Sequence, residues 1–385
     1  MWTTCRRPTE NGFPMTDLAV PAQSTAQVRV PQAELLDFTA AVFAAHGVPA
    51  ERARAAAAAL CHGDITGAGS HGLVNLSRIY LPLLESGRAR ADAKPLVLTD
   101  LGATVLLDAR GALGLWAAGE AMELAVRRAS DYGIGMVSVR GATHFGCAGH
   151  HALRAVDHGM IGVVAANCGH QRIARPPRGR LPMLGTNPLS VAAPAGEHPP
   201  FLLDMSTTAV PTGKVRAAAR AGESIPAGWL ADDRGAPITD PTRFDAGEAH
   251  LSWLGAPGAG EYKGFGLGLM VEVLAALVPG AGLGPSPAAF AADRTPDDDI
   301  GYLMLAIAPA ALRSPGQYRR DAGALFGSVL GCPPVDPGDT VSYPGCPEAA
   351  NAAEAAEFGV PLTGAVHAEL REIADRLGLT APGVS

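Results

Sequence analysis

The sequence predicts an α/β protein with a mixed sheet in the middle of the chain and a helical domain built from both termini. Helix patterns dominate residues 25–105 and return within 335–385, whereas strand-like apolar segments concentrate in residues 106–334. With 385 residues, 48% of them hydrophobic, the chain can bury a large core. Residues 1–24 are polar and irregular, which predicts a flexible extension.

Helices are predicted where apolar residues recur every three or four positions, with Gly47 and Gly133 as stops and Pro49 in a first turn. The predicted helices span residues 31–46, 49–62, 73–84, 113–132, 148–157, 265–277 and 361–377. Short segments rich in Val, Leu and Ile predict strands. The predicted strands span residues 94–98, 104–108, 135–139, 161–165, 189–193, 201–204 and 302–307. The connections 222–260 and 279–298 are long and rich in Gly and Pro, so we expect them to carry function.

Composition excludes several classes of protein. The net charge of −7 argues against binding to nucleic acid or to an anionic membrane. No apolar run approaches the roughly 20 residues that span a bilayer, and no apolar segment follows Arg6-Arg7 as in a signal peptide. The six cysteines form no C-x-x-C pair, which predicts reduced thiols in the cytoplasm.

A short connection between two predicted helices contains Ser70-His71-Gly72. Imidazole titrates near neutral pH, so a histidine among small residues can act there as an acid or a base. Residues 67–72 also read as G-x-G-x-x-G, but that dinucleotide fingerprint requires a preceding strand. An Ala-rich helix pattern precedes them here, so the sequence predicts a fold other than the Rossmann fold. Ser70 and His71 are therefore catalytic candidates.

Other polar residues follow predicted strands or share the helix of His71. His144 lies between a strand and a helix, where α/β proteins gather site residues, or it is a capping or core histidine. Arg78 lies two turns after His71, where a guanidinium can hold a carboxylate, or it is a solvated surface arginine. Residues 204–208 and Lys263 can contact a cofactor's ribose or phosphates, or they are a polar strand end and an ordinary turn. His144, His150, His151 and His158 match no known zinc spacing, so no metal site is predicted.

Motifs in a fixed order over about residues 30–380 resemble those of the type-2 malate/L-lactate dehydrogenases, oxidoreductases without a Rossmann fold. Relatives of this family include ureidoglycolate dehydrogenase and piperideine-2-carboxylate reductase. The matching segments are Gly67-x-x-Ser70-His71-Gly72, His144-Phe145-Gly146, Gly185-Thr186-Asn187-Pro188, Leu203-Asp204-Met205-Ser206-Thr207, Gly213-Lys214, Gly228-Trp229, Thr239-Asp240-Pro241, Tyr262-Lys263-Gly264-Phe265-Gly266-Leu267, Ile300-Gly301 and Tyr343-Pro344-Gly345.

The resemblance implies an NAD- or NADP-dependent enzyme that interconverts a small 2-hydroxy acid and its 2-oxo acid. It implies a mixed-sheet nucleotide-binding core and a homodimer or larger homo-oligomer. Catalysis would rest on Ser70 with His71 or His144, and Arg78 would hold the substrate carboxylate. The implied cofactor contacts are Asn187, Asp204, Met205, Ser206, Thr207, Thr208, Lys263, Gly345 and Cys346. Two alternatives stay open: a reductase of cyclic imino acids, and a family member that binds nucleotide without turnover.

The chain departs from the family pattern at four positions. Gly141 and Ala142 stand where family members commonly have Asn and Ser, which removes two hydrogen-bonding side chains. Tyr302 replaces a usual histidine, and Cys346 replaces a usual acidic residue near the cofactor. These departures leave the substrate and the choice between NAD and NADP open.

Overall fold

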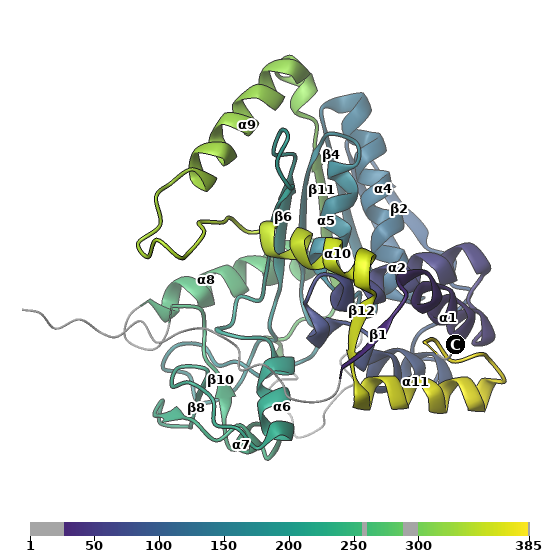
Figure 1. Ribbon diagram of the computed structural model, residues 1–385, viewed down its shortest axis with the longest axis vertical. Helices are drawn as coiled ribbons and strands as arrows, with labels where there is room; N and C mark the ends of the chain where they lie inside the picture. The colour runs from purple at the N-terminus through teal and green to yellow at the C-terminus, as the bar shows by residue number, and fades with distance from the viewer. Residues whose placement is uncertain (1–26, 256–259, 288–298, 384–385) are drawn as a thin grey trace, which may run out of the picture.

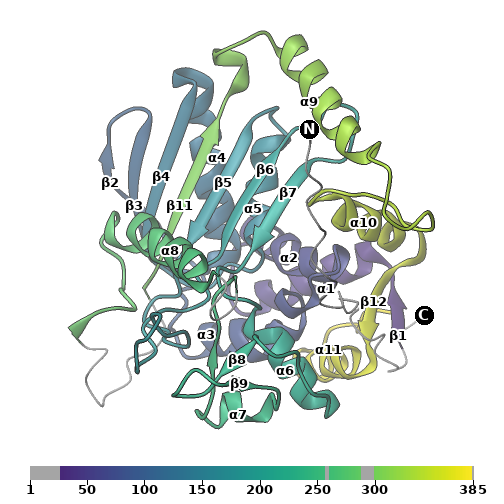
Figure 2. The ribbon, with the colours of Figure 1, turned by 90° about the vertical axis from the view of Figure 1, so that its left-hand side faces the viewer.

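The computed structural model describes residues 27–255, 260–287 and 299–383. It contains a seven-stranded mixed sheet, a helical domain next to one end of that sheet, and a small three-stranded sheet (Figures 1 and 2). The α/β fold predicted from the sequence is confirmed. The predicted extension at residues 1–24 lies outside the described residues.

The large sheet has a central strand that comes late in the sequence. In spatial order its strands are β2 (Leu96–Asp100), β3 (Thr104–Ala112), β4 (Ile134–Ala142), β11 (Ile300–Ile307), β5 (Ile161–Ala166), β6 (Leu189–Ala193) and β7 (Phe201–Met205). Of the described strand pairs in this sheet, β3–β4 is parallel and the others are antiparallel. β11 is almost entirely buried, and its Tyr302 lies opposite Val139 on β4 and Ala166 on β5. β2 and the start of β3 precede residue 106 and belong to this sheet, and the predicted domain boundary at residue 106 stays a prediction.

Helices cover both faces of the sheet. α4 (Gly114–Tyr132) and α5 (Ala148–Val156) pack on one face, and α8 (Glu261–Glu272) continues into η3 (Val273–Leu277) on the other (Figure 2). A Cβ at position 162 of β5 would lie 2.2 Å from a backbone oxygen of α5, so glycine permits this close approach. Two of the segments that the sequence singled out, residues 144–149 and 204–208, leave the sheet beside α5.

The two ends of the described chain pair with each other. β1 (Gln27–Val30) runs antiparallel to β12 (Val360–Thr363), and α1 (Gln32–Ala45), α2 (Ala50–Ile65) and α11 (Gly364–Leu377) complete the helical domain (Figure 1). The prediction of a domain built from both termini is confirmed. The predicted helix 361–377 is wrong at its start, because residues 360–363 form a strand and Thr363 caps the helix by accepting the Val366 N–H at 3.3 Å.

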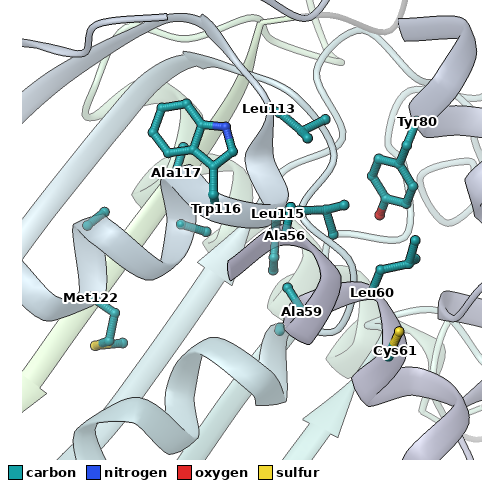
Figure 3. Close-up of a cluster of buried hydrophobic side chains, with 14 of the residues drawn as sticks. Ala56, Ala59, Leu60, Cys61, Tyr80, Leu113, Leu115, Trp116, Ala117 and Met122 are labelled. Carbon is teal, nitrogen blue, oxygen red and sulfur yellow. The ribbon is translucent and has the colours of Figure 1, made fainter. Parts of the chain in front are cut away.

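The main core joins this helical domain to the sheet. Figure 3 shows Leu60 and Cys61 of α2 near Tyr80, with Leu115 and Trp116 of α4 in the same cluster. The predicted helix 73–84 is confirmed, because residues 74–85 are helical. The short turn η1 (Gly69–His71) precedes this helix, which contains the π-helical turn η2 (Leu76–Tyr80) and continues as α3 (Leu81–Glu85). Just before this helix, Gly72 has an extended backbone and the side chain of Asp64 accepts the Leu73 N–H.

Several elements carried too weak a pattern to be predicted. They are α6 (Thr212–Ala221), α7 (Thr242–Asp245), η5 (Pro309–Ala311), α9 (Pro315–Leu330), α10 (Cys346–Phe358) and the strands β8 (Leu230–Ala231), β9 (Pro237–Ile238) and β10 (His250–Leu251). α9 buries Ala322 and Gly323, and α10 buries Ala355, so neither helix has a strong apolar stripe. Among the described helices, none is long and apolar enough to cross a membrane.

Candidate active site

The Ser70-His71-Gly72 connection is fixed by two side-chain hydrogen bonds. Asp64 Oδ2 accepts the Leu73 N–H at 2.7 Å, and Asn75 Nδ2 donates to the Ser70 carbonyl at 2.9 Å. A Cβ on Gly72 would lie 2.1 Å from Asp64 Oδ2, so only glycine fits there. Burial raises the pKa of the Asp64 carboxyl to about 7. The loop that carries His71 is therefore anchored to the end of α2.

His71 and His144 come together from distant parts of the sequence. His144 lies just after β4, and its ring centroid is 6.2 Å from that of His71 with 15° between the ring planes. Burial lowers the pKa of His71. Burial, and then the proximity of His71, lowers the pKa of His144 to about 3. Both imidazoles are therefore neutral at neutral pH.

Each of the two imidazoles has a partner on Nδ1. Ser70 Oγ lies 3.1 Å from Nδ1 of His71, and Tyr80 Oη lies 2.7 Å from Nδ1 of His144. The Gly146 backbone N–H also donates to Nδ1 of His144 at 3.3 Å. Among the described residues, neither Nε2 atom has a hydrogen-bond partner. Two ring nitrogens are therefore available to a ligand.

Tyr80 was not singled out from the sequence. Its only signal is an aromatic hydroxyl beyond His71 in the segment predicted to be helical. The residue is fully buried, and burial raises the pKa of its hydroxyl well above the usual value. Figure 3 shows the Tyr80 ring among the apolar side chains that join α2 to α4. The packing of the core thus places a protonated hydroxyl against His144.

The start of α6 connects this histidine pair to the Asp204–Thr208 segment. α6 follows that segment, and a Cβ on Gly213 in its first turn would lie 2.6 Å from Ser70 Cβ. Glycine at position 213 therefore lets the backbone of α6 pack directly on Ser70. Because only a few residues separate Thr208 from α6, this packing brings the cofactor candidates toward the catalytic candidates.

Most polar groups of the Asp204–Thr208 segment bind other parts of the protein. Asp204 Oδ2 accepts the Gly149 N–H at 2.7 Å, and burial raises the pKa of this carboxyl to about 6. Thr207 Oγ1 donates to backbone carbonyls at residues 186 and 187, and Thr208 Oγ1 donates to that of Val210. Ser206 Oγ donates to the Thr208 carbonyl, and Met205 and Ser206 are both partly exposed. The accessible members of this segment are therefore Asp204, which is exposed, and Met205 and Ser206.

Asn187 belongs to a buried hydrogen-bond network. Its other members, Asn167 and Glu272, were not predicted from the sequence. Asn187 Nδ2 donates to Glu272 Oε2 at 2.8 Å and to the Gly268 carbonyl at 3.0 Å, and the Asn187 backbone has φ +39°. Asn167 Nδ2 donates to Glu272 Oε1 at 3.3 Å, and Gly284 N–H donates to the same oxygen at 2.8 Å. Asn187 Oδ1 is buried and has no partner among the described residues. This network ties the start of β6 to α8.

Lys263 lies in the first turn of α8 and is exposed. The positive end of a helix favours anions, and the ammonium group adds to that field. A cavity of about 570 Å³ lies beside the same helix and is lined by apolar residues that include Phe265, Leu269 and Leu184. The helix therefore offers a cation at its start and an apolar cavity along its length.

The comparisons with known proteins agree with this architecture. Residues 30–371 match the malate/L-lactate dehydrogenase family. The chain belongs to this family. It is similar to malate dehydrogenase from Pyrococcus horikoshii, with 38% identity over 255 residues that cover 66% of this chain and 69% of the relative. It is also similar to the Delta(1)-pyrroline-2-carboxylate/Delta(1)-piperideine-2-carboxylate reductase of Pseudomonas putida, with 34% identity over 263 residues, covering 68% of this chain and 74% of the relative.

Solved structures show the same fold. The crystal structure of malate dehydrogenase from Entamoeba histolytica matches with a TM-score of 0.85 and 25% identity, covering 92% of this chain and 99% of that chain. The family that the ordered motifs predicted is confirmed.

Tyr302, one of the chain's departures from the malate/L-lactate dehydrogenase pattern, lies behind His144. It is fully buried, its hydroxyl donates to the Thr143 carbonyl, and its ring packs edge-on against Phe145 at 4.9 Å. A Cβ on Gly114 would lie 2.5 Å from the Tyr302 hydroxyl, so the start of α4 closes over it. Tyr302 therefore supports the backbone that carries His144.

Cys346, another position where the chain departs from the family pattern, begins α10 next to β7. The Leu202 N–H donates to the Pro344 carbonyl at 2.8 Å, and Gly345 has φ +110°. Glu348 accepts the Gly345 N–H at 3.0 Å, and its charge contributes to the raised pKa of Asp204. The turn before α10 is thus fixed against β7, the strand that ends in the predicted cofactor segment.

Arg78 lies on η2 and faces α11. Its guanidinium is 3.9 Å from a carboxylate oxygen of Glu369, whose other oxygen accepts the Ser77 hydroxyl at 2.7 Å. The Arg78 side chain is 41% exposed. The contact of Arg78 with a substrate carboxylate therefore stays a prediction.

The other histidines near α5 contact one another and the backbone. His62 and His150 are 5.1 Å apart by ring centroid, and His151 Nε2 lies 2.9 Å from the Phe145 carbonyl. In the part of the chain that the structure describes, no three His, Cys, Asp or Glu side chains are grouped to hold a metal ion.

Proposed function

We propose that this protein is an NAD(P)-dependent oxidoreductase that interconverts a small 2-hydroxy acid and its 2-oxo acid. The observation that carries the proposal is the pair of neutral imidazoles of His71 and His144, each with an Nε2 that has no partner among the described residues. Oxidation of a hydroxy acid needs a group that removes the hydroxyl proton, and reduction needs the same group to return it. Membership of the malate/L-lactate dehydrogenase family supports the same chemistry.

The chain's own residues would bind and orient the substrate. His71 and His144 approach the C2 oxygen, and Ser70 orients the imidazole of His71 through Nδ1. Arg78 would hold the carboxylate, because its side chain is exposed and a guanidinium can bind a carboxylate through two hydrogen bonds. A neutral imidazole beside the C2 oxygen can accept a proton from the hydroxy acid and return it to the 2-oxo acid.

The residues present fit a nicotinamide cofactor, which supplies the hydride chemistry when it is bound. Asn187 Oδ1 is a buried acceptor without a partner among the described residues, and Met205 and Ser206 are accessible at the end of β7. Lys263 at the start of α8 would hold a phosphate group. We also place Asp204, Thr207, Thr208, Gly345 and Cys346 near the cofactor. Their hydrogen bonds to other parts of the protein would hold the backbone that surrounds it.

Reduction of a cyclic imino acid is the alternative that a specific observation favours. The Pseudomonas putida relative is named for its reductase activity on pyrroline- and piperideine-2-carboxylate. A C=N bond next to a carboxylate presents nearly the same shape as a C=O bond, and the same histidine would protonate the nitrogen. The two substrates would therefore compete for one site.

We further propose that the protein acts in the cytoplasm as a homodimer or larger homo-oligomer. Exposed apolar side chains on α8 and η3, namely Leu269, Met270, Val273 and Leu277, would be covered by a second copy. The described cysteines are all unpaired, as expected in a reducing compartment.

The test follows NADH and NADPH absorbance with a panel of 2-oxo acids and cyclic imino acids, with and without excess chelator. The expected result is oxidation of the reduced cofactor by at least one 2-oxo acid, unchanged by chelator. Turnover with imino acids alone would select the alternative function. Cofactor binding without turnover of any substrate would identify a non-catalytic member of the family and contradict the proposal.

A further inference from the structure

The hydrogen bonds of the two histidines assign them different roles. We infer that His144 is a fixed hydrogen-bond donor through Nε2–H, that His71 alone exchanges the substrate proton, and that Tyr80 is the positioning residue that fixes His144. This inference rests on the proposed function, because it divides the work of the same site.

The Tyr80 hydroxyl must donate its hydrogen to His144. Its oxygen lies 2.7 Å from His144 Nδ1 and also contacts the Gly146 backbone N–H, which can only donate. Among the described residues, this hydroxyl has no further acceptor, and the side chain is fully buried. Buried hydroxyl groups make hydrogen bonds, so the hydrogen of Tyr80 points at Nδ1. The high pKa of the phenol keeps that hydrogen in place.

A second, longer donor contact supports the same assignment at His144, but it is shared with the Tyr80 hydroxyl and does not fix the tautomer by itself. The Gly146 N–H points at Nδ1 with a distance of 3.3 Å, so this nitrogen faces two donors and must carry a lone pair. In a neutral imidazole the other nitrogen then carries the hydrogen. Burial and the nearby His71 lower the pKa of His144 to about 3, which keeps the ring neutral. His144 therefore presents a permanent Nε2–H and has little capacity to take up a proton.

His71 has a partner that permits either protonation state. Nδ1 of His71 lies 3.1 Å from the Ser70 hydroxyl, which can donate or accept by rotation. The ring can therefore hold its hydrogen on either nitrogen and change during turnover. With 6.2 Å between the ring centroids, both histidines can reach the oxygen of one small substrate.

The proton balance follows from these assignments. In reduction, C2 of the oxo acid gains the hydride that a reduced nicotinamide supplies, and the electron pair of the C=O bond moves to oxygen. His71, which is neutral at rest, first takes up a proton from solvent, and the resulting imidazolium gives this proton to the oxygen and becomes neutral again. His144 donates a hydrogen bond to the same oxygen and keeps its own hydrogen. In oxidation, the neutral His71 takes the hydroxyl proton.

The decisive experiment compares His71→Gln with His144→Gln. A glutamine amide can replace an Nε2–H donor, but it cannot exchange a proton. We expect His144→Gln to lower kcat by about tenfold, as for the weakening of one hydrogen bond. His71→Gln should lower kcat by roughly 10²–10⁴-fold, as for the loss of a general acid. Equal losses, or the larger loss in His144→Gln, would overturn the assignment.

A second readout does not depend on turnover. Nitrogen-15 NMR of protein labelled in its histidine rings reports which ring nitrogen carries hydrogen, and the His144→Gln spectrum assigns the signals of His144. The expected result at neutral pH is a hydrogen on Nε2 and none on Nδ1. Tyr80→Phe, which keeps the ring in the core, should give a mixture of tautomers and lower kcat by about tenfold.

A hydrogen on Nδ1 of His144 in the unmodified protein would refute the inference, as would a spectrum that Tyr80→Phe leaves unchanged. If no 2-oxo or imino acid turns over, the proposed function fails. The tautomer of His144 can still be measured in that case, so the two failures are distinguishable.

Discussion

The histidine pair and the Asn167–Asn187–Glu272 network are both buried polar clusters, yet they leave different groups free. In the network, Glu272 receives three hydrogen bonds and both amide nitrogens also bind backbone carbonyls. In the pair, Tyr80 and Ser70 occupy Nδ1, and both Nε2 atoms have no partner among the described residues. The network is thus built chiefly to hold α8 in place, whereas the pair is built to meet a ligand.

The largest expected effect comes from removing the imidazole of His71. His71→Ala should lower turnover by roughly 10²–10⁴-fold, because a positioned acid/base is lost. Cofactor affinity should hardly change, because the imidazole acts on the substrate. Steady-state kinetics and a cofactor binding titration check both statements. Activity that survives in His71→Ala but disappears in His144→Ala would reverse the roles of the two histidines.

In the Asn167–Asn187–Glu272 network, a substitution should lower the stability of the protein. Glu272→Ala leaves the Gly284 N–H without its partner and weakens the bonds of Asn167 and Asn187. We expect the free energy of unfolding to fall by about 2–4 kcal/mol. The matched control is Glu123→Ala, which removes a partly exposed ion pair with Arg154 worth at most about 1 kcal/mol. Urea unfolding of both variants makes the comparison, and equal losses would show that the network is not structural.

Asp64, which anchors the His71 loop, should make stability depend on pH. Its pKa is raised from 3.8 to about 7 by burial, so the folded state holds this proton more tightly than the unfolded state. The stability from this group is fully present below about pH 3.8 and is lost as the pH rises through about 7. Asp64→Asn keeps an acceptor for the Leu73 N–H but carries no charge.

The free energy of unfolding of Asp64→Asn, relative to the unmodified protein, should therefore be higher at pH 8 than at pH 5 by about 1 kcal/mol or more. Urea titrations at the two pH values give this difference. A difference that does not change with pH would mean that the carboxyl is solvated and does not anchor the loop.

The smallest expected effect is on cofactor preference. Cys346→Glu places a carboxylate beside β7, where it can accept a hydrogen bond from a ribose hydroxyl and repel a 2′-phosphate. Preference should shift toward NADH by about 1–2 kcal/mol. The measurement is kcat/KM with NADH and NADPH for both proteins. An unchanged ratio would remove Gly345 and Cys346 from the proposed cofactor contacts.

The sequence predicted what strong local patterns encode. The predicted strands of the large sheet and the helix at 113–132 are present, because their apolar patterns match buried faces. α9 and α10 were missed because they bury few residues. The contact that anchors the start of the helix at residue 74 was not predicted, because Asp64 lies nine residues away from the Leu73 amide that it binds.

The same limit applies to the site. His71 and His144 were candidates because their neighbours are small or follow a strand, and the fold does bring them together. Tyr80 and Glu272 were missed because each lies in an apolar segment where a buried residue is the ordinary expectation. Their partners come from positions 64 and 85 residues away, respectively, so only the tertiary structure reveals their roles.

The central claim is that C2 of the substrate receives a hydride from the cofactor, whereas its oxygen receives a proton from His71 that exchanges with solvent. The most direct test supplies NADH or NADPH that carries deuterium at both hydrogens on C4 of the nicotinamide, together with the best 2-oxo acid, in ordinary water. Mass spectrometry of the product should find one deuterium on C2 and none that exchanges with water. A product without deuterium, or with deuterium at another carbon, would contradict the proposed chemistry.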